Sequence, residues 1–579
     1  MALFKGSRDQ GVSAPEGESA AECLKAGQSL VEGGFLSAEN MAEALAHANG
    51  DLLSFAEFVT GRFSVGRAET ALALSAATGL QAVDTKGIVV SDEVKNMLPE
   101  ALVRQHCAVA VAEENGTVIV LLTDPAPARK AAIEAEVKRP VKYFIADPAT
   151  VHTFIDTMYR ADADIHRLVA SLDVADDQAK IAAQASEVRL DDQAPVIQLV
   201  NRIVSQAMRD RTSDIHIEPL DDSVRVRFRI DGHLVETFSL PQGVHAALTS
   251  RLKIMSGMNI VEKRRPQDGQ FSTTIDGKDV DVRVASVATV FGEKIVMRIL
   301  DKSRSMIGLG ELGFPRETYL HYSKMIHSPF GMVICAGPTG AGKTTTLYAS
   351  LLEVNSAGKN ITTVEDPVEY VFPGINQIQT NDQAGLTFAT GLKAILRQDP
   401  DVILVGEIRD ADTARIAVQS ALTGHLVLSS LHGTDSVAAL HRFLDMGIEA
   451  FLIASSVVGV IGQRLLRRVC DSCKEPYAPG ADELAVFRQH SGGSEKSTFY
   501  RGAGCNFCAG TGYRDRIGVY ELLRITPELR RLIVGWATTE ELRRLAVAQG
   551  MRTMLREAMA LVENDVTTIP EVVRTLFAS

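Results

Sequence analysis

The residues best suited to chemistry lie in a glycine-rich stretch near the middle of the chain. Residues 337–344 read Gly-Pro-Thr-Gly-Ala-Gly-Lys-Thr, after an apolar run at 332–336 and before a segment of helical character at 345–349. Strand, glycine-rich loop and helix in this order are the context of a phosphate-binding loop. Glycines let backbone N–H groups converge on phosphate oxygens, and the helix N-terminus adds the positive end of its dipole. The pattern therefore predicts a site for a nucleotide polyphosphate.

Each side chain of this phosphate-binding loop suggests its own role. The Lys343 ammonium should reach the β- and γ-phosphates of ATP, and the Thr344 hydroxyl should help to hold Mg²⁺. The predicted cofactor-binding set of the loop is Gly337, Pro338, Thr339, Gly340, Ala341, Gly342, Lys343, Thr344 and Thr345. A simple glycine turn is the alternative, and the strand and helix placed on either side of the loop disfavour it.

Acidic residues follow two further apolar runs. The run at 401–405 leads to Glu407. Ligands bind at the C-terminal ends of strands in open α/β sheets, so this carboxylate could polarise the attacking water or hold Mg²⁺ through a water. An earlier run ends in Glu365, Asp366 and Glu369, which suit metal or water positioning. A solvated acidic loop is the alternative for these three.

Two histidines, His425 and His432, lie at the ends of another buried run. Near a polyphosphate they could sense the γ-phosphate. The alternative for each is a core histidine that donates a hydrogen bond to a backbone carbonyl.

The elements that must position these groups belong to several domains, because 579 residues exceed what one core organises. Asn115-Gly116 between two apolar runs predicts a β-hairpin, and alternating Val and Arg at 224–230 predict a strand with arginines on one face. Thr538 and Glu541 form a capping box ahead of a helix. The predicted segments are 1–20 disordered, 21–160 an N-terminal α/β docking or regulatory region, 161–192 a linker, 193–303 a small arginine-bearing α/β domain, 304–468 the phosphate-binding core, 469–517 a cysteine-bounded segment and 518–579 a helical C-terminal region.

Composition excludes several classes of protein. The net charge is −12 and no long basic run occurs, which disfavours nucleic acid as a partner. The least polar window, 450–463, is too short to span a membrane and suits a buried helix. The N-terminus lacks an apolar signal region, so we expect the protein in the cytoplasm.

Four of the seven cysteines form two C-x-x-C pairs, Cys470 with Cys473 and Cys505 with Cys508. Two such pairs can close a tetrahedral Zn²⁺ site in a reducing compartment, and four thiolates leave no open coordination position. The pattern predicts structural zinc. Four free thiols are the alternative.

The ordered motifs resemble those of the type II/type IV secretion ATPase family, the GspE/PulE/PilB group. The sequences that carry the resemblance are GPTGAGKTTT at 337–346, VEDPVEY at 364–370, LRQDPDVILVGEIRD at 396–410 and TGHLVLSSLH at 423–432, together with DIHIEP, VRFRIDG, KRRPQDG and QRLLRRVC. The resemblance is strong over 195–579 and looser over 60–160.

The resemblance implies an α/β, multidomain protein with a RecA-like ATPase core, a preceding α/β domain, a zinc lobe and a helical C-terminal region. It implies a homo-hexameric ring at the cytoplasmic face of the inner membrane, where ATP hydrolysis drives a platform protein in pilus assembly or type II secretion. By motif, Glu407 is the Walker B acid, Glu365, Asp366 and Glu369 form the Asp box, and His425 and His432 form the His box. Arg283 and Arg298 match arginines that approach the phosphates, and Arg397 and Arg409 match others near the site.

Other functions stay open from the sequence alone. A non-hydrolysing, nucleotide-responsive scaffold and a P-loop kinase are the alternatives, but Lys343, Thr344 and Glu407 are intact and no acceptor signature is found. Residues 25–36 resemble cyclic di-GMP-binding modules of some pilus ATPases, without their usual arginine-leucine pair. Docking to a membrane partner is the simpler interpretation of this region.

Overall fold

The structure is a computed structural model that describes residues 18–577 apart from 64, 84, 86–87, 89, 160–164, 166–167, 169–194, 276–277, 302–306 and 494–495. The predicted disordered start and the predicted linker at 161–192 fall almost wholly outside the described residues. The chain divides into two compact units, 1–210 with 243–251 and 505–510, and the remaining residues. The finer domain boundaries stay predictions.

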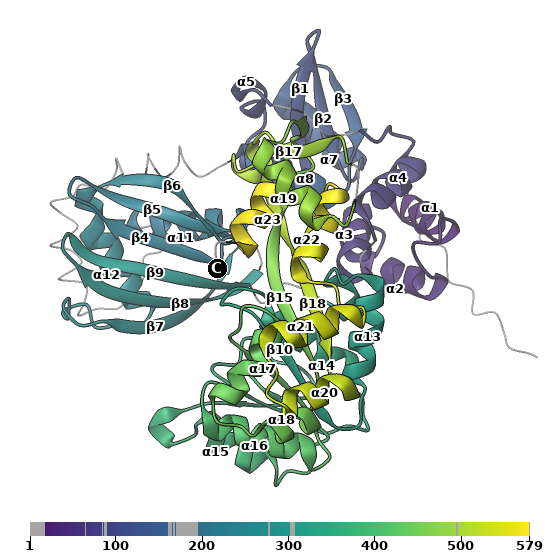
Figure 1. Cartoon of the computed structure of the whole chain (residues 1–579). Helices are drawn as coiled ribbons and strands as arrows, with labels where there is room; N and C mark the ends of the chain where they lie inside the picture. Colours follow the sequence, from purple (N-terminus) through teal and green to yellow (C-terminus); the bar gives the residue numbers. More distant parts are fainter. Residues whose placement is uncertain are drawn as a thin grey trace, which may run out of the picture. The chain divides into compact units, whose positions relative to one another are not determined.

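The first unit combines helices with a small sheet of order β1-β2-β3 (Figure 1). Its strands are β1 (Ala108–Glu114), β2 (Thr117–Leu122) and β3 (Val141–Ile145). Asn115 and Gly116 both have positive φ, 51° and 77°, and join β1 to β2 as the predicted hairpin. The helices are α1 (Glu18–Glu32), α2 (Ala38–Ala48), α3 (Leu52–Arg62), α4 (Arg67–Thr78), α5 (Asp92–Lys95), α6 (Glu100–His106), α7 (Pro127–Val137), α8 (Pro148–Met158) and α11 (Pro195–Arg209).

The second unit contains an antiparallel six-stranded sheet of order β6-β5-β4-β9-β8-β7. In β5, Val224, Val226 and Phe228 are buried, whereas the arginines between them are half-buried on the opposite face, as the alternation predicted. The strands are β4 (Asp214–Pro219), β5 (Ser223–Ile230), β6 (His233–Pro241), β7 (Gln267–Ile275), β8 (Lys278–Thr289) and β9 (Gly292–Asp301); α12 (His245–Met255) lies between β6 and β7 in the chain.

The same unit holds a seven-stranded sheet of order β12-β11-β13-β14-β10-β15-β18, in which only β18 is antiparallel to its neighbour. Its central strands are apolar on both faces, as expected of a parallel sheet covered on both sides. The strands are β10 (Gly331–Ala336), β11 (Ile361–Glu365), β12 (Asn376–Gln379), β13 (Val402–Val405), β14 (Leu426–Leu431), β15 (Val457–Val469) and β18 (Tyr513–Arg524).

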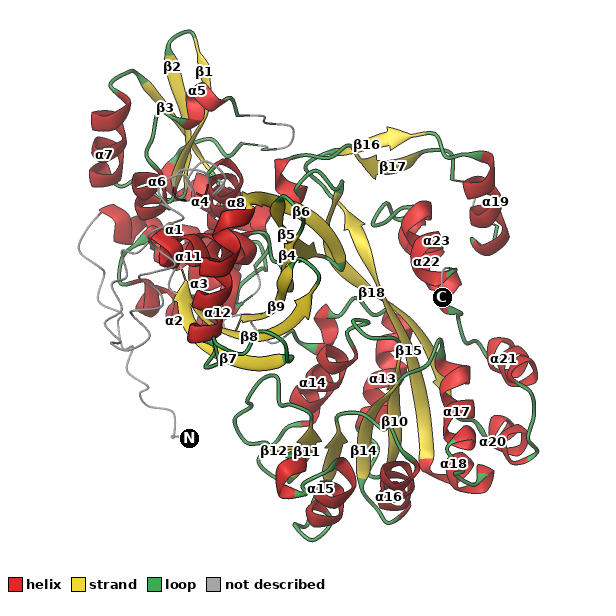
Figure 2. Cartoon of the chain, turned by 90° about the vertical axis from the view of Figure 1, so that its left-hand side faces the viewer, coloured by secondary structure: helices red, strands yellow, loops and turns green. Residues whose placement is uncertain are grey.

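Helices cover both faces of this sheet (Figure 2). Strand β10 shows why: Met332 and Ile334 belong to one buried cluster, and Val333 and Cys335 to the other. Helices α13 (Arg316–Ile326) and α14 (Lys343–Val354) pack on the Val333 side. Packed on the Met332 side are α15 (Phe388–Ile395), α16 (Ala411–Leu422), α17 (Ser436–Asp445), α18 (Ala450–Ser456), α20 (Pro527–Val534) and α21 (Thr539–Ala548).

The remaining elements surround the far end of β15. They are β16 (Lys474–Tyr477), β17 (Phe499–Gly502), α19 (Ala481–His490), α22 (Met554–Glu563) and α23 (Ile569–Leu576). The predicted capping box of Thr538 and Glu541 is present at the start of α21. The helical C-terminal region begins at Pro527 rather than at residue 518, because 518–524 belong to β18 of the core sheet.

The prediction of a buried helix over 450–463 is wrong for its second half. Helix α18 ends at Ser456, and β15 begins at Val457 and pairs with β10. The run of β-branched residues from Val457 to Ile461 favours a strand, and long-range pairing supplies the partner. Within the described part of the chain, no helix is both long enough and apolar enough to cross a bilayer.

Candidate nucleotide site

The phosphate-binding loop joins β10 to α14, as the sequence predicted. Gly340 and Gly342 have φ of 77° and 86°, a region that side chains disfavour, so the path of the loop requires glycine at both positions. Lys343 folds back over the loop, and its Nζ donates to the carbonyl oxygens of Gly337 at 2.9 Å and Pro338 at 3.0 Å. The Lys343 ammonium therefore donates to backbone carbonyls at the position where a phosphate is predicted.

The electrostatics of Lys343 suit an anion. Burial lowers the pKa of the Lys343 ammonium, and the neighbouring Cys335 and Glu407 oppose that shift. A partly desolvated ammonium gains more from a nearby phosphate than an exposed one does, because solvent screens it less. Thr344, in the first turn of α14, is exposed beside it.

Glu407 follows β13 at the C-terminal edge of the sheet, where β14 alone lies between β13 and β10, the strand from which the phosphate-binding loop starts. Its carboxylate pairs with the Arg409 guanidinium, and one oxygen lies 3.5 Å from His432 Nε2. Arg409 also lies 3.8 Å from the Asp366 carboxylate, which joins the acids after β11 and β13. We call the C-terminal ends of β10, β11, β13 and β14 the nucleotide edge. The hydrogen bond to Glu407 raises the pKa of Arg409.

Glu365 occupies a different environment from the other acids. It is buried and accepts hydrogen bonds from the Tyr348 and Thr363 hydroxyls and from Gln377 Nε2. Burial and the Glu365 carboxylate raise the pKa of Tyr348, so the phenol keeps the proton that it donates. The same hydroxyl accepts from the Glu369 N–H at 3.2 Å. In this structure Glu365 anchors α14 to β11 and does not face solvent.

Arg283 and Arg298 lie opposite each other on β8 and β9 of the six-stranded sheet. Arg283 lies 3.4 Å from the carboxylate of Glu369, one of the predicted Asp-box residues. Arg298 donates from Nε to Asp214 at 3.0 Å and remains 61% exposed. Both arginines line a cavity of about 470 Å³. Arg397, after the end of α15, is exposed.

The structure separates the two predicted histidines. His432 follows β14 and joins Glu407 at the nucleotide edge, whereas His425 precedes β14. A six-residue parallel strand spans roughly 20 Å, so His425 lies at the opposite end of the sheet. Its Nδ1 lies 2.9 Å from the Ser420 carbonyl oxygen, which is the structural alternative that the sequence left open. His425 is therefore not part of the nucleotide edge.

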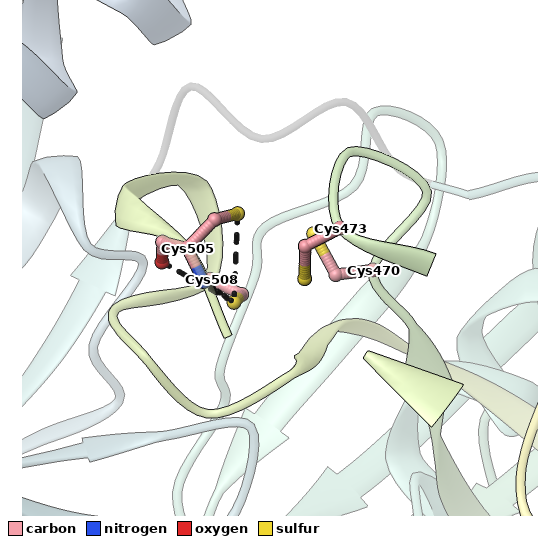
Figure 3. A group of neighbouring side chains, drawn as sticks. All are labelled: Cys470, Cys473, Cys505 and Cys508. Atoms are coloured by element: carbon pink, nitrogen blue, oxygen red, sulfur yellow. Dashed lines mark hydrogen bonds between the residues drawn. The ribbon is translucent and has the colours of Figure 1, made fainter. Parts of the chain in front are cut away.

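The four cysteines of the C-x-x-C pairs come together, with all sulfur atoms within 4.8 Å of one another (Figure 3). We call Cys470, Cys473, Cys505 and Cys508 the cysteine cluster. A tetrahedral zinc–thiolate site with Zn–S bonds of about 2.3 Å needs sulfurs about 3.8 Å apart, so the geometry fits zinc after a small contraction. The residue set, four thiols and no other ligand, suits a structural site.

Close backbone approach explains part of the glycine content around the cysteine cluster. A Cβ on Gly502 would lie 2.0 Å from the Gly512 carbonyl oxygen. Gly504 and Gly510 have φ of 94° and 76° in the turns beside Cys505 and Cys508. These positions admit no larger residue without rearrangement of the turns.

Two residues that sequence reasoning missed contact the predicted site residues. Tyr348 binds Glu365, and Gln463 donates to the Ala341 carbonyl within the phosphate-binding loop. Tyr348 has a weak sequence signal, since it lies one helical turn beyond Thr344 on the helix that carries the loop. Gln463 is the first residue of the QRLLRRVC motif, but nothing in that motif places it at the loop, because only the pairing of β15 with β10 brings it there.

Comparison with known proteins gives the family. The model of the "Type II/IV secretion system protein" family matches residues 189–574, and the "MshEN domain" model matches 78–165. The chain is 37% identical to the type IV pilus assembly ATPase PilB of Myxococcus xanthus, over 94% of this chain and 98% of that protein. It is 44% identical to the type II secretion system ATPase E of Vibrio cholerae, over 66% of this chain and 76% of that protein.

A solved structure supports the fold alone. The ATPase DotB of Yersinia pseudotuberculosis aligns with a TM-score of 0.50 at 20% identity, over 66% of this chain and 94% of that chain. The extent of the family match and the identity to proteins named as ATPases confirm the resemblance found in the motifs. The chain belongs to the type II/IV secretion system protein family and is an ATPase with a RecA-like core.

Proposed function

We propose that the chain forms a homo-hexameric ring that couples ATP hydrolysis to type IV pilus assembly or type II secretion by driving a platform protein of the inner membrane. The names of its relatives, pilus assembly ATPase and type II secretion ATPase, support both systems equally. The observation that carries the proposal is the nucleotide edge, where Lys343, Glu407 and Asp366 follow the C-terminal ends of β10, β13 and β11 in one parallel sheet. This edge is where an open α/β sheet binds its ligands.

In the proposed site, each residue has a separate task. Lys343 exchanges the carbonyls of Gly337 and Pro338 for phosphate oxygens, and Thr344 supplies a hydroxyl to Mg²⁺. Glu407 orients and polarises the attacking water. Bound Mg²⁺ would neutralise phosphate charge that the protein's own cations leave uncompensated.

The Glu407 ion pair supports this assignment. Arg409 and His432 hold the Glu407 carboxylate at the nucleotide edge, and both of those partners are more than half exposed. Partners of this kind can move toward a nucleotide when it arrives. The Glu365 carboxylate, which accepts from three donors, instead helps to position the other two Asp-box residues, Asp366 and Glu369.

Arg283 and Arg298 are proposed to bring positive charge to the phosphates when the domains close. Arg283 already contacts Glu369, so it needs only a short movement to reach the other acids of the nucleotide edge. An arginine that arrives only on closure stabilises the transition state more than the ground state, which raises kcat. Arg397 is assigned to the same site by motif alone.

The cysteine cluster is proposed to bind one structural Zn²⁺. The residues at 21–160 are proposed to dock the ring to a membrane partner of the machinery. Cyclic di-GMP is the alternative ligand of this region. Isothermal titration of the full-length protein with the dinucleotide tests it. A measurable heat of binding would favour cyclic di-GMP as a ligand, and no heat would favour docking alone.

Two substitutions test the nucleotide site. We expect Lys343→Ala to lose nucleotide binding and turnover together, because the loop loses its only ammonium. We expect Glu407→Gln to bind ATP normally and to release phosphate about 10²–10³-fold more slowly, the range for loss of a group that acts in the transition state. Phosphate release and binding of a fluorescent ATP analogue measure the two effects. Normal turnover by Glu407→Gln would remove this residue from its proposed role.

A further inference from the structure

The phosphate-binding loop rests on a residue that lies far from it in the sequence. Strand β15 runs parallel to β10, with Ile461 opposite Cys335 and Gly462 opposite Ala336. The next residue, Gln463, lies beside the first glycine of the loop and is 2% exposed.

The Gln463 side-chain amide makes three hydrogen bonds to three different elements. Its Nε2 donates to the Ala341 carbonyl in the loop at 2.7 Å. Its Oε1 accepts from Thr346 Oγ1 of α14 at 2.8 Å and from Cys335 Sγ of β10 at 3.2 Å. One amide therefore connects the strand before the loop, the loop itself and the helix after it.

The packing around Gln463 also shapes the glycine pattern. A Cβ on Gly337 would lie 2.6 Å from the Gln463 carbonyl oxygen, and a Cβ on Gly342 would lie 2.8 Å from Nε2. The loop thus comes as close to Gln463 as glycine allows.

The bond to Ala341 fixes the orientation of a peptide group. In a trans peptide the C=O and the following N–H point in opposite directions. Because Gln463 holds the Ala341 carbonyl toward β15, the N–H of Gly342 points away from β15. A phosphate-binding loop works through such N–H groups, so their direction matters for affinity.

We infer that Gln463 is a positioning residue for nucleotide binding: it sets the conformation of the phosphate-binding loop through Ala341 and Thr346 without touching the nucleotide. The inference rests on the proposed nucleotide site. The competing explanation is structural, since any buried amide must find partners, and a test must separate the two.

Gln463→Glu is the sharpest variant because it conserves shape. It keeps the oxygen that accepts from Thr346 and replaces the donor to Ala341 by an oxygen that repels the carbonyl. We expect the KM for ATP to rise about tenfold or more, within the up to 10²-fold cost of misplacing a group by about 1 Å. Gln463→Leu, which removes all three bonds, should raise KM at least as much, and kcat should change less than KM in both variants.

The matched control is Tyr322→Phe. Tyr322 is fully buried in the same unit, and its hydroxyl bonds to Ser350 on α14, away from the loop. This variant loses a buried hydrogen bond of the same kind and should lower the melting temperature while leaving KM unchanged.

Thr346→Val adds a second measurement. It frees Gln463 Oε1 from one partner, so its effect on ATP affinity should overlap with that of Gln463→Leu, and the double variant should bind only as weakly as Gln463→Leu. If the effects of Thr346→Val and Gln463→Leu on ATP affinity were strictly additive in free energy, the two residues would not act on the loop together.

The outcomes separate this inference from the proposed site. If Lys343→Ala abolishes binding while both Gln463 variants bind ATP like the native protein, the inference is overturned and the site stands. If Lys343→Ala binds ATP normally, the site itself is wrong. An equal rise of KM in Tyr322→Phe would make Gln463 a purely structural residue, and an unfolded Gln463→Leu leaves Gln463→Glu to decide.

Discussion

The nucleotide edge and the cysteine cluster are both built from polar side chains on loops, and they differ in what those side chains already bind. At the nucleotide edge, Lys343 donates to backbone carbonyls, and Glu407 pairs with a largely exposed arginine. These partners can be exchanged for a ligand. In the cysteine cluster, four equivalent sulfurs face one another and offer a closed ligand set. Partners that can be exchanged suit a site that turns over ATP, and a closed set of four thiols suits a metal that stabilises the fold.

Removal of metal should have the largest effect, and it should fall on stability alone. We expect Cys470→Ser to lose the proposed Zn²⁺ and to destabilise the fold by at least about 5 kcal/mol. This cost is below the about 10–16 kcal/mol that zinc supplies to small fingers, because β16 and β17 also pair through their backbones. Metal content and thermal melting measure the effect. Cys23→Ser, a buried cysteine outside the cluster, is the control and should keep its metal. Equal metal content in both variants would refute the zinc assignment.

Loss of Arg283 should have the next largest effect, on turnover. We expect Arg283→Ala to lower kcat about 10²-fold with little change in ATP affinity, because its present partner is Glu369 and not the phosphate-binding loop. The measurement is steady-state hydrolysis by the assembled protein beside equilibrium binding of an ATP analogue. A loss of affinity as large as the loss of kcat would place Arg283 in ground-state binding. Arg397→Ala, at an exposed position, serves as the comparison.

The two histidines give the smallest and most specific contrast. His432→Gln should lower kcat by up to about tenfold, because it removes a partner of Glu407 at the nucleotide edge. His425→Gln should leave kcat unchanged and cost about 1 kcal/mol of stability, the value of one hydrogen bond to the Ser420 carbonyl. Comparable kinetic defects in both variants would contradict the placement of His425 at the far end of β14.

Local patterns predicted the parts of the molecule that local physics determines. The phosphate-binding loop, the Asn115-Gly116 hairpin and the arginine face of β5 all follow from residues adjacent in sequence. The position of His425 was also readable: it precedes its strand, and ligands of parallel sheets gather where strands end. The motif resemblance paired it with His432, and this pairing obscured the direction of the strand.

Long-range pairing determined what the sequence could not show. Residues 457–463 read as the continuation of an apolar helix until β10 provides a neighbour for them. The contacts of Gln463 with the loop and of Tyr348 with Glu365 depend on the same kind of assembly. The helical spacing of Tyr348 from Thr344 is a weak signal for its position and does not identify Glu365 as its partner, and no spacing in the sequence reveals the contact of Gln463 with the loop.

We propose that the nucleotide edge binds ATP through the phosphate-binding loop and cleaves it with the help of Glu407. The most direct measurement is to incubate the native protein and Glu407→Gln with Mg-ATP and to identify the nucleotide that remains bound to each. The nucleotide that co-purifies with each protein gives the same comparison. We expect ADP on the native protein and intact ATP on Glu407→Gln. Conversion of bound ATP to ADP at the same rate by both proteins would contradict it.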